Sequence, residues 1–174
     1  MIIDLDTVIL RRFELKDIER LYTFRNDWDV IRSLVGFSKG YSTKDIADWI
    51  EIHRARSGEI LWCIAETQTD LCLGHVGLYQ VDHRVRCAEF GILIGETTWW
   101  GRGVGTAVSS AVVRYGFLEL NLHRIQLSVL ASNTRAVRIY EKLGFHQEGV
   151  HRDAQFREGR FCDVLTMAIL ENKC

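Results

Sequence analysis

The residues with the clearest chemical potential form a glycine-rich loop, Trp99-Trp100-Gly101-Arg102-Gly103-Val104-Gly105-Thr106. An apolar run precedes this loop, and a helical pattern begins within it near Gly103. Alternate glycines directly before a helix leave backbone N–H groups uncovered at the positive end of the helix dipole, and Arg102 adds a basic side chain. The loop therefore predicts a phosphate site. The alternative is a tight turn that uses glycine for steric reasons alone.

Two common nucleotide-binding loops do not fit this spacing. A dinucleotide fold requires G-x-G-x-x-G near the start of a βαβ unit, whereas the glycines here run G-x-G-x-G after a region that reads as antiparallel. A P-loop requires a lysine after its last glycine, and Thr106 follows Gly105. Both designs are excluded by the sequence.

Composition indicates one globular domain over residues 1–174, because 47% of the residues are apolar. Lys plus Arg total 22 against 23 for Asp plus Glu, which gives no global charge for nucleic acid or an anionic membrane. No run approaches the roughly 18 apolar residues of a transmembrane helix, and the first residues lack a basic n-region. We therefore expect a soluble, cytoplasmic protein with neither nucleic acid nor a membrane as its partner.

The cysteines and histidines do not predict a metal site. Five cysteines, without any C-x-x-C pair, fit reduced thiols in a cytosol. The six histidines show no metal-ligand spacing such as H-E-x-x-H. We expect no metal, and no cysteine nucleophile.

The pattern along the chain predicts alternating strands and helices in the order β-α-α-β-β-β-α-β-α-β-β. A βαβ unit that follows an antiparallel meander implies a mixed sheet with helices on both faces, and so an α/β class. The predicted strands cover 7–13, 60–67, 72–81, 86–95, 124–130, 145–156 and 160–170. Two of the predicted helices cover 15–28 and 103–120. A third is capped by Ser42-Thr43, and a fourth begins at Ser132-Asn133-Thr134 and ends at Gly144.

The chain resembles the GNAT N-acetyltransferase superfamily. The resemblance rests on the strand-loop-helix around Gly103-Val104-Gly105, on Asn133 at a helix start, and on Tyr140-Glu141-Lys142-Leu143-Gly144-Phe145. Leu10-Arg11-Arg12 and Phe156-Arg157-Glu158-Gly159-Arg160 are typical of the branch that holds ribosomal-protein N-terminal, spermidine and amino-sugar acetyltransferases. One departure is Trp100, which stands where the family usually has Gln or Arg.

The resemblance implies a GNAT-like central sheet, mixed but largely antiparallel, of about seven strands. It also implies acetyl-CoA as co-substrate, with its pyrophosphate on the backbone N–H groups of residues 102–106, that is Arg102, Gly103, Val104, Gly105 and Thr106. Family members splay the strand that corresponds to Phe90–Ile94 from the next one, so that main chain near Ile92, Leu93 and Ile94 is open to pantetheine and to the thioester carbonyl. Asn133 would hold the pantetheine arm, although Asn is also a favoured N-cap.

Two residues are candidates for proton transfer. The family places a tyrosine at the position of Tyr140 that protonates the leaving thiolate; from spacing alone, this residue reads as a core aromatic. Glu89 is the only acidic or basic residue of 87–94 apart from the thiol of Cys87, and a carboxylate removed from water accepts a proton more readily near neutral pH. The alternative for Glu89 is a pair with Arg84, Arg86 or another arginine. Glu96, Asp82 and His83 are further candidates.

The acceptor site is the least defined by the sequence. The resemblance places it between the first two helices and the last hairpin, which brings forward Asn26, Trp28, Tyr79 and Arg152. We expect a primary amine as acceptor, whether a protein N-terminus, a polyamine or an amino sugar. The family also suggests a homodimer. The runner-up interpretation is a non-catalytic CoA-binding regulatory module of the same fold, which would need neither Tyr140 nor Glu89.

Overall fold

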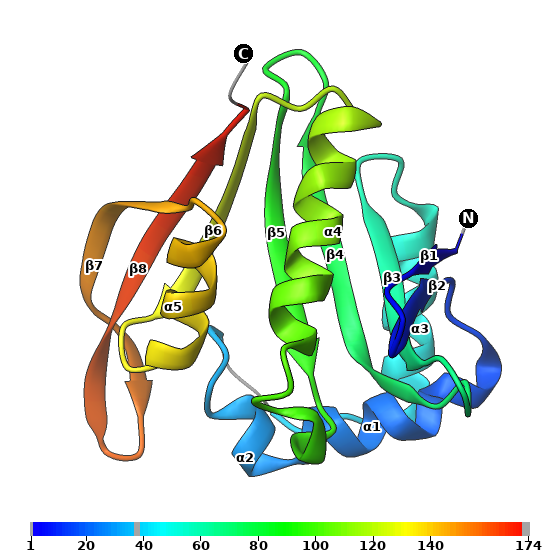
Figure 1. The fold of residues 1–174 in the computed structure, drawn as a ribbon. Helices are drawn as coiled ribbons and strands as arrows, with labels where there is room; N and C mark the ends of the chain where they lie inside the picture. Colours follow the sequence, from blue (N-terminus) through cyan, green and yellow to red (C-terminus); the bar gives the residue numbers. More distant parts are fainter. Residues whose placement is uncertain (1, 37–38, 172–174) are drawn as a thin grey trace.

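One eight-stranded sheet organises the molecule in the computed structural model, which describes residues 2–36 and 39–171 (Figure 1). Its strands lie side by side in the order β1-β2-β3-β4-β5-β6-β8-β7. The strands are β1 (Ile3–Asp4), β2 (Val8–Arg11), β3 (Ile60–Glu66), β4 (Cys72–Asp82), β5 (Cys87–Ile94), β6 (Arg124–Leu130), β7 (His146–Arg157) and β8 (Arg160–Leu170). The α-helices are α1 (Ile18–Asn26), α2 (Trp28–Ile31), α3 (Thr43–Ala55), α4 (Val104–Leu118) and α5 (Thr134–Lys142), with short 3-10 turns η1 (Leu15–Asp17) and η2 (Thr97–Trp99).

The predicted fold class is confirmed, with two local differences. The sheet has one strand more than the seven expected, because Ile3–Asp4 pairs antiparallel with β2. The single helix expected over 15–28 is divided into η1, α1 and α2. The division between α1 and α2 falls at Asp27, whose extended backbone (ψ 119°) stops α1. The Asp27 side chain accepts a hydrogen bond from Asp29 N–H at 2.8 Å, and so starts a new helix.

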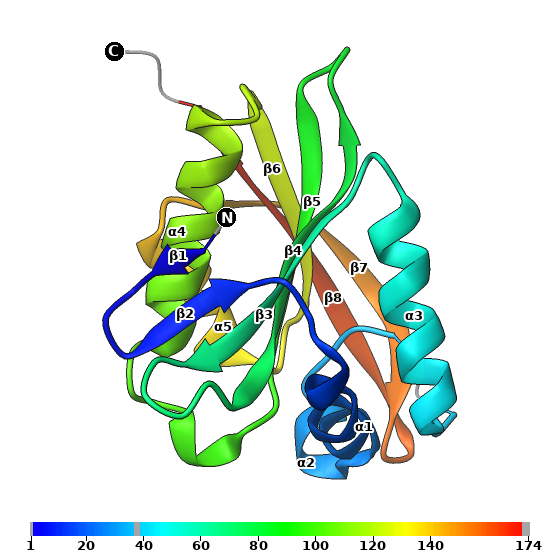
Figure 2. The ribbon, with the colours of Figure 1, turned by 90° about the vertical axis from the view of Figure 1, so that its right-hand side faces the viewer.

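The two faces of the sheet carry separate helices and separate hydrophobic cores (Figure 2). α4 and α5 cover one face, where Val108, Val112 and Phe90 are buried. α1 and α3 cover the other face, where Phe24 and Ile46 pack with Leu93. Because side chains alternate along a strand, β5 sends Phe90 to the first core and Leu93 to the second. β5 thus contributes side chains to the hydrophobic cores on both faces of the sheet.

A fork opens in the sheet between β5 and β6. These are the only two adjacent strands recorded as parallel in the described sheet, and they pair only at Cys87–Arg124, Ala88–Ile125 and Glu89–Gln126. Beyond Glu89 both strands continue without pairing to one another, and Figure 1 shows them diverging. The fork leaves main chain of a central strand open.

Within residues 2–36 and 39–171, no helix is both long and apolar enough to cross a membrane.

Candidate active site

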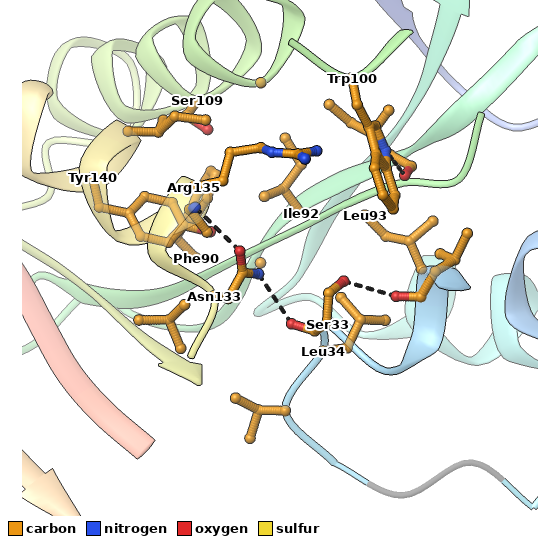
Figure 3. Close-up of a pocket in the computed structure, with 18 of the residues that line it drawn as sticks. Ser33, Leu34, Phe90, Ile92, Leu93, Trp100, Ser109, Asn133, Arg135 and Tyr140 are labelled. Atoms are coloured by element: carbon orange, nitrogen blue, oxygen red, sulfur yellow. Dashed lines mark hydrogen bonds between the residues drawn. The ribbon is translucent and has the colours of Figure 1, made fainter. Parts of the chain in front are cut away.

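A cleft of about 710 Å³ occupies the fork and extends along both faces of β5. β5 lines it from Glu89 to Ile94, the glycine loop and α5 form its walls, and the segment after α2 covers one end (Figure 3). This volume lies in the range of pockets that hold a cofactor or a small ligand.

Main-chain groups of β5 face the open side of the fork. Gly95 N–H donates to Leu73 O of β4 at 2.8 Å, and the pairing of β4 with β5 is regular from Gly74 to Tyr79. Because backbone groups alternate along a strand, Leu93 also directs its N–H toward β4. The N–H groups of Ile92 and Ile94 therefore point toward β6. Of the three predicted residues, Ile92 and Ile94 offer open main chain, and Leu93 contributes a buried side chain.

The glycine loop ends in an uncapped helix N-terminus. Gly101 and Gly103 have φ values of 77° and 83°, a left-handed conformation that favours glycine. Gly103 is the N-cap of α4, and no side chain bonds to the first turn, in contrast to Ser42 on α3 and Asn133 on α5. The N–H groups of Val104, Gly105 and Thr106 therefore have no partner within their helix. This arrangement suits a phosphate.

Two arginines lie against the tryptophans of the loop. Trp100 Nε1 donates to Ile94 O at 2.8 Å, which ties the loop to the end of β5. The Arg135 guanidinium lies over the Trp100 ring at 5.0 Å, and Arg102 lies over Trp99 at 5.6 Å (Figure 3 for Arg135 and Trp100). Trp100, the departure from the family pattern, is therefore a platform for a cation from α5. The sequence reasoning did not identify Arg135, which lines the cleft.

Tyr140, on α5, lines the cleft. Its ring meets Phe90 edge-on at 6.1 Å and tilts against Phe145 at 5.7 Å, and 8% of the residue is exposed. Its hydroxyl makes no hydrogen bond with any residue that the structure describes. Burial raises the pKa of Tyr140 to about 12, so the phenol holds its proton at neutral pH. Tyr140 is therefore a buried core aromatic whose hydroxyl has no partner among the described residues, and its role as a proton donor stays a prediction.

Glu89 occupies the point where the strands separate. It is half-buried and lines the cleft, and it forms no ion pair with the described residues. Arg86, a possible partner of Glu89 from the sequence, binds Asn121 and Glu171 instead. Across the sheet Glu89 is paired with Tyr79, which also lines the cleft. Burial, and secondarily the negative charges of Glu59 and Glu89, raise the pKa of Tyr79 well above its usual range.

Gly91 lies next to this pair for a steric reason. A Cβ at Gly91 would meet the Tyr79 ring at 3.1 Å, so the glycine lets that ring lie against the sheet. The other carboxylates considered from the sequence are engaged elsewhere. Glu96 pairs with Arg20 at 2.9 Å, and Asp82 accepts from the N–H groups of its own turn.

Asn133 combines a cap with a long-range contact. Its Oδ1 accepts from Ala136 N–H at 3.2 Å, as expected for an N-cap. Its Nδ2 donates to Ser33 O at 3.1 Å, which holds the segment after α2 against α5 (Figure 3). Asn133 also lines the cleft, and its predicted contact with pantetheine stays a prediction.

The predicted acceptor residues are not brought together. Tyr79 lines the cleft, whereas Asn26, Trp28 and Arg152 do not. Asn26 is used structurally, because both ends of its amide bond the main chain of Tyr41. Trp28 is exposed and donates to Glu158, and Arg152 is exposed on β7.

Other charged and polar side chains line the cleft together with Tyr79. They are Arg25, Asp29, Arg32 and His75. Arg25 belongs to the segment 24–28 that the family resemblance brings within reach of the acceptor, and its charge suits a phosphorylated or carboxylated acceptor, whereas the sequence carries no such signal for Asp29, Arg32 or His75.

One group of side chains in the described part of the chain has the types and spacing to hold a metal ion: Asp17, Cys63 and Cys72. It is buried away from the cleft. The Asp17 carboxylate already accepts from Arg11 at 2.8 and 2.9 Å and from Glu14 N–H at 2.8 Å. We assign this group to a buried ion pair that anchors η1 on the sheet.

Comparison with known proteins identifies the family. The model of the acetyltransferase (GNAT) domain matches residues 7–146. The chain belongs to the GNAT acetyltransferase family. It is an N-acetyltransferase, as its relatives are.

Relatives of this GNAT chain differ in the acceptors they are named for. The spermidine N(1)-acetyltransferase of Vibrio cholerae is 30% identical over 94% of this chain and 93% of its own. An L-amino acid N-acetyltransferase of Escherichia coli (strain K12) is 32% identical, over 55% of this chain and 60% of its own. A crystal structure of the Vibrio cholerae spermidine enzyme in complex with CoA and spermine superposes with a TM-score of 0.86 at 28% identity, and covers 94% of this chain and 95% of that one.

Proposed function

We propose that this GNAT chain moves the acetyl group of acetyl-CoA to a primary amine by direct attack within a ternary complex. The observation that carries the proposal is the fork: open main chain of β5, an uncapped N-terminus of α4 and the Tyr140 hydroxyl all border one cleft. The crystal structure of a relative with CoA supports this interpretation.

CoA fits the cleft by chemistry. Its pyrophosphate would accept hydrogen bonds from the N–H groups of residues 102–106, with the charges of Arg102 and Arg135 nearby. Pantetheine is an extended amide chain, and the free N–H groups of Ile92 and Ile94 suit it as an added strand suits an open edge. Asn133 would contact the same arm.

The reaction needs one bond formed, one broken and two proton movements. The amine nitrogen attacks the thioester carbonyl carbon, the C–N bond forms, and the C–S bond breaks. Tyr140 gives its proton to the departing thiolate, and Glu89, directly or through water, takes the proton that the amine loses. An N–H of β5 aimed at the thioester oxygen would stabilise the developing charge, for which one donor is typically worth about 3–4 kcal/mol.

The acceptor is proposed as a protein N-terminus, a polyamine or an amino sugar. The spermidine enzymes among the relatives favour a polyamine. The cleft lining gives a different indication, because it carries arginines as well as carboxylates. Fold and family alone therefore do not select among these amines.

The test is acetyl transfer to an amine panel, followed by thiol release and by the mass of each amine. We expect a gain of one acetyl group on at least one amine, with stoichiometric release of free thiol. In Glu89→Gln we expect kcat to fall at neutral pH and to recover partly as pH rises and more amine is already uncharged. CoA binding without thiol release from any amine would instead favour a regulatory module.

A further inference from the structure

The acceptor end of the cleft contains a guanidinium group without a counter-ion. Arg25, on the last turn of α1, lines the cleft and forms no ion pair with any residue of 2–36 or 39–171. Its one hydrogen bond runs from Nη2 to Nε2 of His75, at 3.1 Å. Because a guanidinium carries five N–H donors, most of those of Arg25 remain without a protein acceptor.

Aromatic rings hold this guanidinium in place. Arg25 Cζ lies over the Trp49 ring at 4.5 Å and over the Tyr41 ring at 5.7 Å. The two rings come from α3 and from the segment before it, and with His75 of β4 three separate parts of the chain contact this one guanidinium. A stacked arginine is oriented, and its free edge is available to a flat anionic group.

The neighbouring histidine does not alter this charge. His75 accepts the Arg25 hydrogen bond through Nε2, which places its own proton on Nδ1. Burial, then the charge of Arg25 and the proximity of His53, hold the pKa of His75 well below its usual range. His75 is therefore neutral and adds no charge of its own. A ligand bound next to this pair interacts with the positive charge of Arg25.

The carboxylate of Glu89 lines the same cleft as Arg25. Glu89 pairs with Tyr79 across the sheet, and Arg25 lines the same cleft as both residues, so this part of the cleft carries one carboxylate and one guanidinium of opposite charge. The remaining ionised pair at this end, Arg32 and Asp29, is joined at 3.2 Å and largely cancels. A bound polycation would find one free carboxylate and one opposing guanidinium.

We propose that the acceptor carries an anionic oxygen group, a carboxylate or a phosphate, next to its amine, and that Arg25 binds this group. This inference rests on the acetyl transfer proposed above and adds the acceptor's chemical class. The ammonium end would approach Glu89, where the proton must leave, and the anionic end would lie on Arg25. The opposite charges of the cleft then match the opposite charges of the acceptor.

Matched pairs of amines test the assignment. The probes are the L-amino acids with their carboxamides, O-phosphoethanolamine with ethanolamine, and spermidine, each with acetyl-CoA. For at least one pair we expect kcat/KM at least tenfold higher for the anionic member, and the pair that shows it distinguishes carboxylate from phosphate. Spermidine should be a poorer acceptor than that anionic amine.

Variants separate binding by Arg25 from a general defect. In Arg25→Gln the preference should fall to near unity, mainly through KM, while the neutral member keeps its rate within about threefold. Arg25→Lys should retain part of the preference, since a charge without the planar fork remains. Arg12→Gln, an exposed arginine outside the cleft, is the matched control and should leave the preference intact. A thermal melt of each variant confirms folding.

The outcomes that overturn the inference are distinct from those that overturn the transferase proposal. Spermidine or the neutral amines acetylated more efficiently than every anionic partner, with no effect of Arg25→Gln, would overturn the anionic acceptor and leave acetyl transfer standing. Absence of acetylation of every probe, and also of peptides and amino sugars, despite binding of acetyl-CoA, would overturn both.

Discussion

The side-chain amide of Asn133 donates to the carbonyl of Ser33 at 3.1 Å while its oxygen caps α5. One residue thereby joins α5, which forms a wall of the cleft, to the segment after α2, which covers one end of it. The same segment is held from the β7–β8 hairpin, where Arg157 donates to Leu34 O at 3.2 Å. Hydrogen bonds from α5 and from the β7–β8 hairpin therefore hold the segment after α2 in place over the cleft.

Asn133→Ala should therefore affect both stability and acceptor binding. Loss of a cap costs about 1 kcal/mol, and loss of the Ser33 contact frees the covering segment. We expect a lower melting temperature and a higher KM for the acceptor. Asn133→Ser separates the two effects, because serine caps well but is too short to reach Ser33: stability should return, and KM should stay raised. Equal stability losses in both variants would contradict this division.

Removal of the Tyr140 hydroxyl should reduce turnover rather than binding. A general acid contributes typically 10²- to 10⁴-fold, so Tyr140→Phe should lower kcat by about 100-fold or more. The CoA dissociation constant should change by less than about threefold, because the ring still packs on Phe90 and Phe145. Since burial raises the pKa of Tyr140 to about 12, the wild-type enzyme should keep this acid up to about pH 11. Tyr22→Phe, an exposed tyrosine on α1, is the control, and unchanged kcat in Tyr140→Phe would remove the assignment.

The left-handed glycine at the start of α4 should matter for CoA affinity beyond its strain. Gly103 has φ 83°, and a Cβ there meets nothing within 4 Å, so Gly103→Ala costs about 1–2 kcal/mol through backbone strain. Gly159, at φ 78° with the same open surroundings in the β7–β8 turn, is a matched control. We expect both alanine variants to lose similar stability in denaturant melts, and only Gly103→Ala to weaken CoA binding, measured by calorimetry. Equal CoA affinity in the two variants would place the phosphate elsewhere.

The cation on Trp100 should contribute to CoA binding through its charge. Arg135→Gln removes the guanidinium that lies at 5.0 Å from the Trp100 ring, and we expect about a tenfold weaker CoA affinity. The difference from wild type should shrink as salt is added. Arg138→Gln, an exposed arginine of the same helix that does not line the cleft, should leave the affinity unchanged. Equal effects of the two variants would indicate general electrostatics rather than a site on Trp100.

Local signals allowed most of the fold to be predicted from the sequence. β6 was placed at its observed ends by strict alternation, and Ser42 and Asn133 were recognised as caps because a cap depends on residues within one turn. The two-residue strand β1 was missed since it has no periodicity of its own, and its pairing with β2 defines it. Asp27 divided a helix that periodicity alone joined.

The acceptor end could not be predicted in the same way. Arg25, Trp49 and His75 come together from two helices and a strand, 24 to 50 positions apart, and no spacing rule connects them. Asn26 was proposed for the substrate, yet the main chain of Tyr41 uses its amide completely. The sequence carries no signal for Arg135, because its position in the cleft depends on a contact with Trp100, which lies 35 positions earlier in the glycine loop. Such contacts are decided by the packing of distant elements on the sheet.

His75 should make the fold sensitive to mild acid. Burial, followed by the charge of Arg25 and the proximity of His53, holds its folded pKa well below the ordinary value of 6.5. Below that ordinary value the unfolded chain binds a proton that the folded chain does not, so stability is present above pH 6.5 and is lost as pH falls. The loss approaches about 1.4 kcal/mol per pH unit from this one side chain.

Urea melts at pH 7.5, 6.5 and 5.5 should show this loss of unfolding free energy. His75→Gln should flatten the dependence across this window, since glutamine does not titrate, while His151→Gln at an exposed position of β7 should not. Parallel pH profiles for the His75→Gln variant and the wild-type protein would show that His75 is not the group responsible.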